Sequence, residues 1–76
     1  MTITVETGSW AARWLDQRVI LLTDMPADAT AADAILAAGI PQDEAGVIVR
    51  NGTLIPKDHR LSHGDVIKIH PIIIGG

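Results

Sequence analysis

A short helix with clear start and stop signals is the feature that most constrains the fold of this 76-residue chain. Thr30 is a good N-cap, and Asp33 stands three residues later at the capping-box position. Gly39 and Pro41 predict the helix end, as a C′ glycine and a following residue that cannot continue the helix. A helix of about nine residues is unstable alone. It must therefore be held by packing against a sheet.

The apolar pattern inside this segment predicts which helix face is buried. Ala32, Ile35, Leu36 and Gly39 follow the i, i+3, i+4, i+7 spacing of one helix face. We therefore expect these four residues to face the sheet.

Segments with strand character lie on both sides of the helix. Residues 2–6 alternate polar and apolar, and residues 18–23 are β-branched and aliphatic. After the helix, residues 47–50 and 53–55 flank Asn51-Gly52, the preferred two-residue hairpin turn. These segments predict two strands before the helix and a hairpin after it.

The last strand is expected from Val66 to about Ile72, after a turn at Gly64-Asp65. Ile67 and Ile69 are expected to point into the core, because alternate residues of a strand face opposite sides. The residues expected on the other side are Val66, Lys68 and His70. Leu61, in the polar loop before this strand, is expected to anchor that loop.

The element order favours one mixed sheet of about five strands packed on one main helix. We therefore expect an α+β fold of the β-grasp kind. A short helical insert is expected after the first strand, with Ser9 capping it and Trp10 and Trp14 covering the core. We expect a single domain over residues 1–76, with residues 72–76 as a flexible C-terminal tail. One sheet face is left free for a partner.

Composition limits the class of function. The chain has no cysteine, so neither a disulfide nor a thiolate metal site is available. A net charge of −3 with scattered basic residues argues against nucleic acid as a partner. Apolar runs such as residues 19–22 fall far short of the ~20 residues of a membrane span, and no targeting signal is visible. We expect a cytoplasmic protein that binds neither nucleic acid nor membrane.

Two histidines have a spacing that could place them on one metal ion. His59 and His63 are four residues apart, the spacing of a helical metal-binding pair. They lie in a loop with no third ligand evident, so a surface role is expected and no metal site is predicted. Asp58 and Asp65 are not expected to form an acid/base pair, since Asp65 fits a turn residue.

Several short motifs together give the chain a family resemblance. They are Asn51-Gly52-Thr53-Leu54, Asp58-His59, Leu61, Gly64-Asp65 and the terminal Gly75-Gly76. With these, the chain resembles the MoaD/ThiS family of small β-grasp sulfur carriers, and the helical insert is more similar to the MoaD branch. His70-Pro71-Ile72 departs from the family, which often has Phe-Pro-Pro or Phe-Gln before the tail.

The resemblance implies a chemistry for the end of the chain. The carboxylate of Gly76 would be adenylylated and then converted to a thiocarboxylate that donates sulfur. Gly75, Ile74, Ile73 and Ile72 would thread into the active site of a partner, since glycine fits slots too narrow for other residues. The residues implied at the partner-binding face are His70, Lys68 and Pro71. The chain would supply no catalytic side chain, so it would be a carrier and co-substrate rather than an enzyme.

The resemblance also implies the partners. The first is an adenylyltransferase of the ubiquitin-activating type (MoeB/ThiF-like) that uses ATP and Mg²⁺, while the chain itself binds no cofactor. The second is a sulfurtransferase or cysteine desulfurase as the sulfur source. The third is a sulfur-accepting enzyme such as the molybdopterin synthase large subunit or thiazole synthase. Molybdopterin or its tungsten analogue is the favoured recipient, with thiamine thiazole second.

Two other functions remain open at this point. In the first, the chain is a ubiquitin-like modifier, and the activated Gly76 carboxyl joins a lysine of another protein. In the second, it is a non-covalent β-grasp interaction domain whose Gly-Gly is accidental. The first shares tail and activation with the sulfur carrier, so the sequence does not separate these two.

Overall fold

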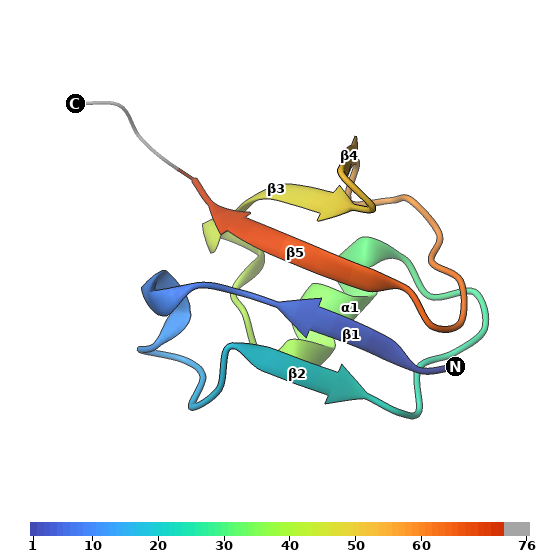
Figure 1. The fold of residues 1–76 in the computed structure, drawn as a ribbon, viewed down its shortest axis with the longest axis horizontal. Helices are drawn as coiled ribbons and strands as arrows, with labels where there is room; N and C mark the ends of the chain where they lie inside the picture. Colours follow the sequence, from blue (N-terminus) through green and yellow to red (C-terminus); the bar gives the residue numbers. More distant parts are fainter. Residues whose placement is uncertain (73–76) are drawn as a thin grey trace.

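The computed structural model describes residues 1–72 of the chain (Figure 1). Its strands are β1 (Ile3–Glu6), β2 (Val19–Leu22), β3 (Ala45–Arg50), β4 (Thr53–Ile55) and β5 (Val66–Pro71). They form one five-stranded sheet in the order β2-β1-β5-β3-β4. The pair β1 and β5 is parallel and the other pairs are antiparallel. With the helix α1 (Ala31–Ala38), this arrangement confirms the predicted α+β, β-grasp fold.

The start and stop signals of α1 act as predicted. The Asp33 N–H donates to Thr30 Oγ1 at 3.3 Å, and the Thr30 N–H donates to Asp33 Oδ2 at 2.9 Å. Gly39 ends the helix with a φ of +91°, a conformation that costs glycine little because it lacks a Cβ. No helix within residues 1–72 is long and apolar enough to cross a membrane.

The buried face of α1 differs from the predicted one. Its buried residues are Ala31, Ala34, Ile35 and Ala38. Leu36 is 69% exposed, while Gly39 is exposed and Ala32 is half-buried, so only Ile35 was placed correctly. The helix is rich in alanine, so most of its positions have the same hydropathy. The apolar pattern therefore does not single out one face. The three alanines let the helix axis approach the sheet, and Leu36 is left outside.

The core lies between α1 and one face of the sheet. Its largest fully buried side chains are Ile3, Val5, Ile35, Ile40, Ile48, Ile67 and Ile69. The predicted inward direction of Ile67 and Ile69 is therefore confirmed. Leu61, only 4% exposed, anchors the loop before β5 as expected. Aliphatic residues fill this core because the chain has no phenylalanine or tyrosine.

The insert after β1 is a single turn of 3₁₀ helix, η1 (Ser9–Ala11). Gly8 precedes it and no side chain caps it, so the predicted capping role of Ser9 was wrong. In this tight turn the Ala11 N–H already bonds to the Gly8 carbonyl oxygen, at 3.1 Å. Trp10 packs against the core as predicted. Within residues 1–72 Trp14 does not, and it meets the edge of Trp10 at a centroid distance of 6.3 Å.

The hairpin between β3 and β4 is confirmed. Asn51 and Gly52 have φ values of +53° and +78°, as a two-residue turn with two left-handed residues requires. Arg50 and Thr53 face each other across the turn. Pro56 follows β4, which is an edge strand, where a residue without an N–H is tolerated. A second 3₁₀ turn, η2 (Gln42–Glu44), leads from α1 into β3.

Candidate functional site

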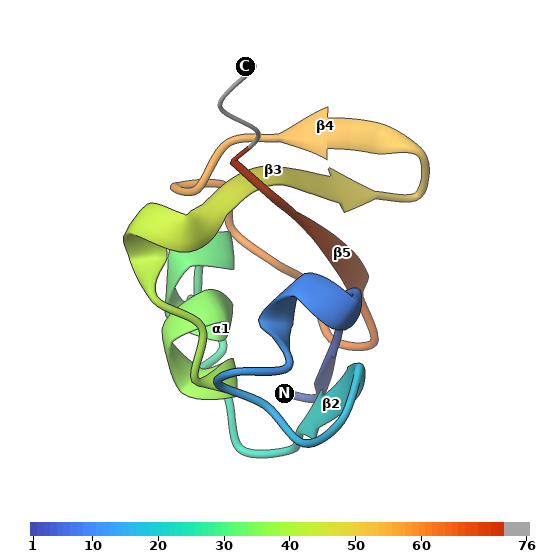
Figure 2. The ribbon, with the colours of Figure 1, turned by 90° about the vertical axis from the view of Figure 1, so that its left-hand side faces the viewer.

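The sheet face opposite α1 carries the side chains that the sequence assigned to a partner. Figure 2 shows α1 against one face of the sheet only. Lys68 and His70 of β5 are exposed on the other face, as predicted from the strand alternation. Lys68 is flanked by Glu6 of β1 and Val49 of β3, whereas His70 lies beyond the end of β1 and pairs with Val47 of β3.

The strand register shows what surrounds Lys68. Directly paired residues share a sheet face, and one row crosses all five strands. That row is Val19, Glu6, Lys68, Val49 and Leu54. A second row contains Leu21, Thr4 and Val66, and Val47 pairs with His70. We call the residues of these rows the open face.

The open face is apolar around a few charges. Its large apolar residues are Val19, Leu21, Val47, Leu54 and Val66, each between 41% and 68% exposed. Several large exposed apolar residues on one face are typical of an interaction surface. Glu6 and Lys68, paired in register, give it both signs of charge.

A hollow of about 210 Å³ lies where β5 ends. It is lined by residues 68–71 of β5 and by Thr7, Gly8 and Trp10. The structure therefore brings the predicted partner residues Lys68, His70 and Pro71 into one place. It adds Trp10, which the sequence assigned to core cover alone. The signal for this second role is weak in the sequence: tryptophan has an apolar body and a polar N–H, which suits interfaces as well as cores.

The end of β5 is held against β3 by a close backbone approach. The ladder shifts register between Ala45 and Val47, opposite Pro71. A Cβ on Gly46, between them, would lie 2.7 Å from the Pro71 carbonyl oxygen. The Ile72 N–H bonds to the Glu44 carbonyl oxygen at 3.4 Å, and Ile72 is 51% exposed. The chain is thus positioned up to Ile72, whereas Ile73, Ile74, Gly75 and Gly76 lie outside the described residues.

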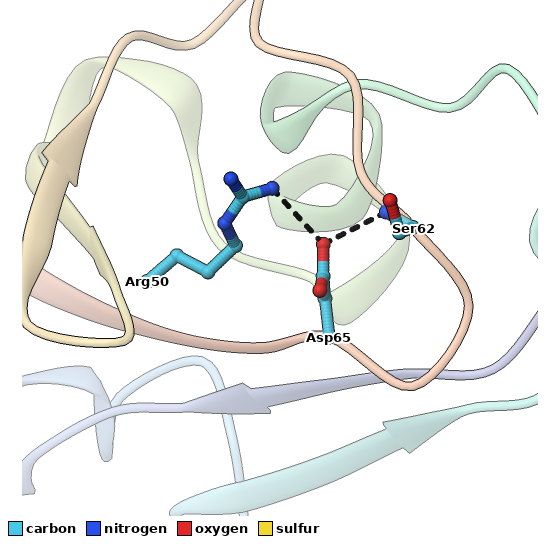
Figure 3. A network of polar contacts seen from close by, with 3 residues as sticks. All are labelled: Arg50, Ser62 and Asp65. Atoms are coloured by element: carbon cyan, nitrogen blue, oxygen red, sulfur yellow. Dashed lines mark hydrogen bonds and ion pairs between the residues drawn. The ribbon is translucent and has the colours of Figure 1, made fainter.

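The start of β5 is held by a polar network (Figure 3). Asp65 Oδ2 accepts a hydrogen bond from the Ser62 N–H at 2.7 Å and forms an ion pair with Arg50 Nη1 at 3.3 Å. Gly64 has a φ of +87° beside it. The predicted role of Asp65 as a turn residue is confirmed.

Each of the two loop histidines accepts a hydrogen bond from another segment, His63 through its side chain and His59 through its backbone. His63 Nδ1 accepts a hydrogen bond from the Thr2 N–H at 3.0 Å. The His59 carbonyl oxygen accepts from the Ala31 N–H at 2.9 Å. In the described part of the chain, no three histidine, aspartate or glutamate side chains gather closely enough to hold a metal ion.

The sequence of the chain matches the Mut7-C ubiquitin family over residues 15–74. The chain belongs to the Mut7-C ubiquitin family. The match begins at Leu15, between η1 and β2, and extends past β5, so it includes α1 and the hairpin. No curated protein matches this Mut7-C ubiquitin chain in sequence.

Solved structures share the fold of this Mut7-C ubiquitin protein. The crystal structure of SAMP1 from Haloferax volcanii matches with a TM-score of 0.74 and 21% identity, covering 100% of both chains. A solved structure from Pyrococcus furiosus, assigned as subunit 1 of a molybdopterin converting factor, matches with a TM-score of 0.74 and 17% identity. The match covers 96% of this chain and 99% of that one. These likenesses confirm the expected MoaD/ThiS-like, ubiquitin-like fold.

Proposed function

We propose that this Mut7-C ubiquitin protein is a sulfur carrier whose Gly76 carboxyl group cycles between carboxylate, acyl adenylate and thiocarboxylate. The observation that carries the proposal is the path of β5. This central strand presents Lys68 and His70 on the open face and continues into Ile72-Ile73-Ile74-Gly75-Gly76. A partner that docks on the open face thereby meets the chain that leads to the two glycines.

The activation step follows from the chemistry of a carboxylate. This anion is resonance-stabilised and resists nucleophiles. On a MoeB/ThiF-like adenylyltransferase, a Gly76 carboxylate oxygen attacks the α-phosphorus of ATP, the bond to the β-phosphate breaks, and pyrophosphate leaves with Mg²⁺. The product is a mixed anhydride with AMP as a good leaving group. ATP and Mg²⁺ belong to the partner, and the carrier binds no cofactor of its own.

The sulfur step needs a persulfide from a sulfurtransferase or cysteine desulfurase. Its terminal sulfur attacks the Gly76 carbonyl carbon and AMP leaves. A second thiol of that enzyme then cleaves the S–S bond, which leaves the thiocarboxylate on the carrier. The chain has no cysteine that could capture the adenylate first. Gly75 and Gly76 lack a Cβ, so the tail fits a narrow channel.

Docking is assigned to the open face together with the hollow beside Trp10. The hollow lies at the point where β5 ends, next to Pro71. A partner side chain inserted there would fix the direction in which residues 72–76 enter the active site. The carrier contributes position and a reactive end, and no catalytic side chain, so we propose that it is not itself an enzyme.

For the recipient of sulfur we propose molybdopterin or its tungsten analogue, with the molybdopterin synthase large subunit as the accepting enzyme. The insert η1 and the fold shared with the Pyrococcus furiosus converting factor subunit support this choice. Thiamine thiazole, made by a thiazole synthase, is the second candidate. These steps are proposed to take place in the cytoplasm.

A second candidate function is protein modification, in which a lysine amine displaces AMP from Gly76. It is favoured by the equally good likeness to SAMP1, the small archaeal modifier protein 1 of Haloferax volcanii. Both functions use the same activated end. They differ only in the nucleophile that attacks Gly76, which is a persulfide in the sulfur carrier and a lysine amine in the modifier.

Intact mass spectrometry of the protein from its native cells tests the proposal. Replacement of one terminal oxygen by sulfur on Gly76 is the expected result, and the co-purifying enzyme identifies the pathway. Isopeptide linkage of Gly76 to lysines would instead establish the modifier. If Gly76 carries neither form and can be deleted without effect on growth or cofactor levels, both functions are excluded.

A further inference from the structure

Within residues 1–72, the strand β2 has no strand partner on one side of its backbone. It lies at the edge of the sheet, and nothing is drawn beyond its outer side in Figure 1. The Thr7 N–H bonds to the Arg18 carbonyl oxygen at 2.8 Å, which fixes the ladder between β1 and β2. Because an antiparallel ladder alternates, the N–H and C=O groups of Arg18, Ile20 and Leu22 point to β1. Those of Val19 and Leu21 point outward, and Thr23 follows the end of β2.

This edge lacks the features that protect most edge strands. Such strands are usually interrupted by lysine, proline or a bulge, which prevents pairing with other chains. The sequence of β2 is Val-Ile-Leu-Leu, with Val19 53% and Leu21 62% exposed. The opposite edge, β4, has three residues and is followed by Pro56. The two edges are therefore not equivalent, and within residues 1–72 β2 is the longer edge strand and has no proline directly after it.

Two unlike charges bracket β2. Arg18 precedes it and Asp24 follows it by two residues, and both are exposed. Within residues 1–72 neither forms an ion pair with another side chain. Arg18 and Asp24 lie three residues before and three residues after Leu21. A strand with this pattern is complementary in charge to itself when it is reversed.

We propose that β2 pairs antiparallel with β2 of a second copy, about a two-fold axis through Leu21. Outward groups must meet outward groups, so Leu21 faces Leu21 and Val19 faces Thr23 of the partner subunit. In this register Arg18 faces Asp24 of the partner subunit, twice by symmetry. Self-complementary two-fold contacts of this kind are the commonest in homo-oligomers.

Other registers of the same two strands are worse. A slip of one residue places inward-pointing groups against outward-pointing ones, so hydrogen bonds are lost. A slip of two residues in one direction places Arg18 opposite Leu22 and Asp16 opposite Asp24. A slip of two in the other direction places Arg18 opposite Pro26 and Asp24 opposite Ile20, so neither charge meets an opposite one. Only the register centred on Leu21 satisfies both hydrogen bonds and charges.

The proposed dimer extends the sheet without covering the functional site. Both open faces lie on the same side of the continuous sheet, with both α1 helices on the other side. The two β5 strands run in opposite directions, so the two tails leave at opposite ends. About six backbone hydrogen bonds form across the axis, and the small contact predicts a weak dimer with a dissociation constant on the order of 100 μM. This inference does not depend on the proposed function.

Charge reversal is the first test, read by analytical ultracentrifugation between about 10 μM and 1 mM, where such a dimer forms. Arg18→Asp alone and Asp24→Arg alone should each weaken self-association at least ~10-fold, since like charges then face each other. An equimolar mixture of the two variants should associate again, because every cross-strand pair is then complementary. The double variant Arg18→Asp/Asp24→Arg should also dimerise. Arg60→Asp, an exposed reversal in the loop before β5, is the control and should not affect the equilibrium.

A cross-link at the axis is the second test, and the chain suits it because it has no cysteine. Leu21→Cys places two thiols on facing residues of a hydrogen-bonded pair, whose Cα atoms are about 5.5 Å apart, within the range that a disulfide spans. Under mild oxidation it should form a covalent dimer at least ~10-fold faster than Leu54→Cys. Leu54 is a matched control, 68% exposed on the opposite edge.

Three results would overturn the proposal. The first is a wild-type chain that is monomeric at about 1 mM. The second is a dimer that is indifferent to the reversals at Arg18 and Asp24. The third is equal cross-linking of Leu21→Cys and Leu54→Cys. None of these results bears on whether Gly76 carries sulfur.

Discussion

Arg50 Nη1 and Asp65 Oδ2 lie 3.3 Å apart, and the same Asp65 oxygen accepts the Ser62 N–H at 2.7 Å (Figure 3). The ion pair joins the last residue of β3 to the residue immediately before β5. The hydrogen bond joins that residue to the loop that precedes it. One carboxylate oxygen therefore sets the point at which the central strand begins.

Replacement of Asp65 by alanine should destabilise the protein more than replacement of Arg50 by alanine. The first change removes two interactions and the second removes one partly buried ion pair, so we expect losses of about 2 and about 0.5 kcal/mol. Urea denaturation followed by tryptophan fluorescence measures both. Asp65→Asn is the matched control, because its amide oxygen can still accept the Ser62 N–H. Equal losses for the two alanine variants would mean that the Ser62 bond contributes nothing.

The capping box at Thr30 and Asp33 should contribute measurably to a helix of only eight residues. Thr30→Ala is expected to cost about 1 kcal/mol of unfolding free energy. Thr30→Ser keeps the acceptor oxygen and should cost less. Since the two side chains bond reciprocally, Thr30→Ala and Asp33→Ala should be non-additive in a double-mutant cycle. Additive losses would show that the two hydrogen bonds are independent.

Gly46 should be intolerant of even a methyl group. Its Cβ would lie 2.7 Å from the Pro71 carbonyl oxygen, so Gly46→Ala must displace the end of β5 and cost about 1–3 kcal/mol. NMR chemical shifts of Ile69 to Ile72 should change with it. Gly64→Ala makes a suitable comparison, because φ is +87° there but nothing lies within 4 Å. That variant should lose stability through backbone strain while the resonances at Pro71 stay in place.

The hollow beside β5 should matter for activation. If the adenylyltransferase docks there, Trp10→Ala and His70→Ala should each raise the carrier concentration that gives half-maximal ATP–pyrophosphate exchange by about 10-fold. The control variant Leu36→Ala removes an apolar side chain that is 69% exposed on α1, away from the open face. It should leave the exchange unchanged. A loss of the same size for Leu36→Ala would place the docking surface elsewhere.

The position of the terminal carboxylate, on Gly76, should be decisive for the proposed chemistry. Deletion of Gly76, or addition of one alanine after it, should abolish adenylylation while circular dichroism and urea midpoint stay unchanged. Both variants leave β5 intact and move only the carboxylate. A substantial exchange rate in either would exclude a mechanism that acts on Gly76.

The features that the sequence predicted well depend on residues close together in the chain. The capping box of Thr30 and Asp33 spans three residues, and the Asn51-Gly52 turn needs only the strands beside it. In both, the interacting groups are neighbours, so the local pattern is sufficient. The direction of Ile67 and Ile69 followed from strand alternation in the same way.

The features that it missed depend on contacts between distant segments. Leu36 was assigned to the core because an alanine-rich helix offers no contrast in side-chain size, and only the sheet beneath it selects a face. Trp10 borders the hollow because β1 and β5 are parallel neighbours, a pairing that no local pattern encodes. The register shift at Gly46 is likewise fixed by β5, more than 20 residues later.

The central place of β5 determines how the molecule responds to force. Traction on the chain beyond Ile72 acts along a strand that is bonded on one side to β1 and on the other to β3. The hydrogen bonds on both sides lie across that direction and are loaded in shear, so they resist together. An edge strand pulled away from the sheet would peel off one bond at a time. The protein can therefore be drawn by its end into a narrow channel while the sheet stays closed.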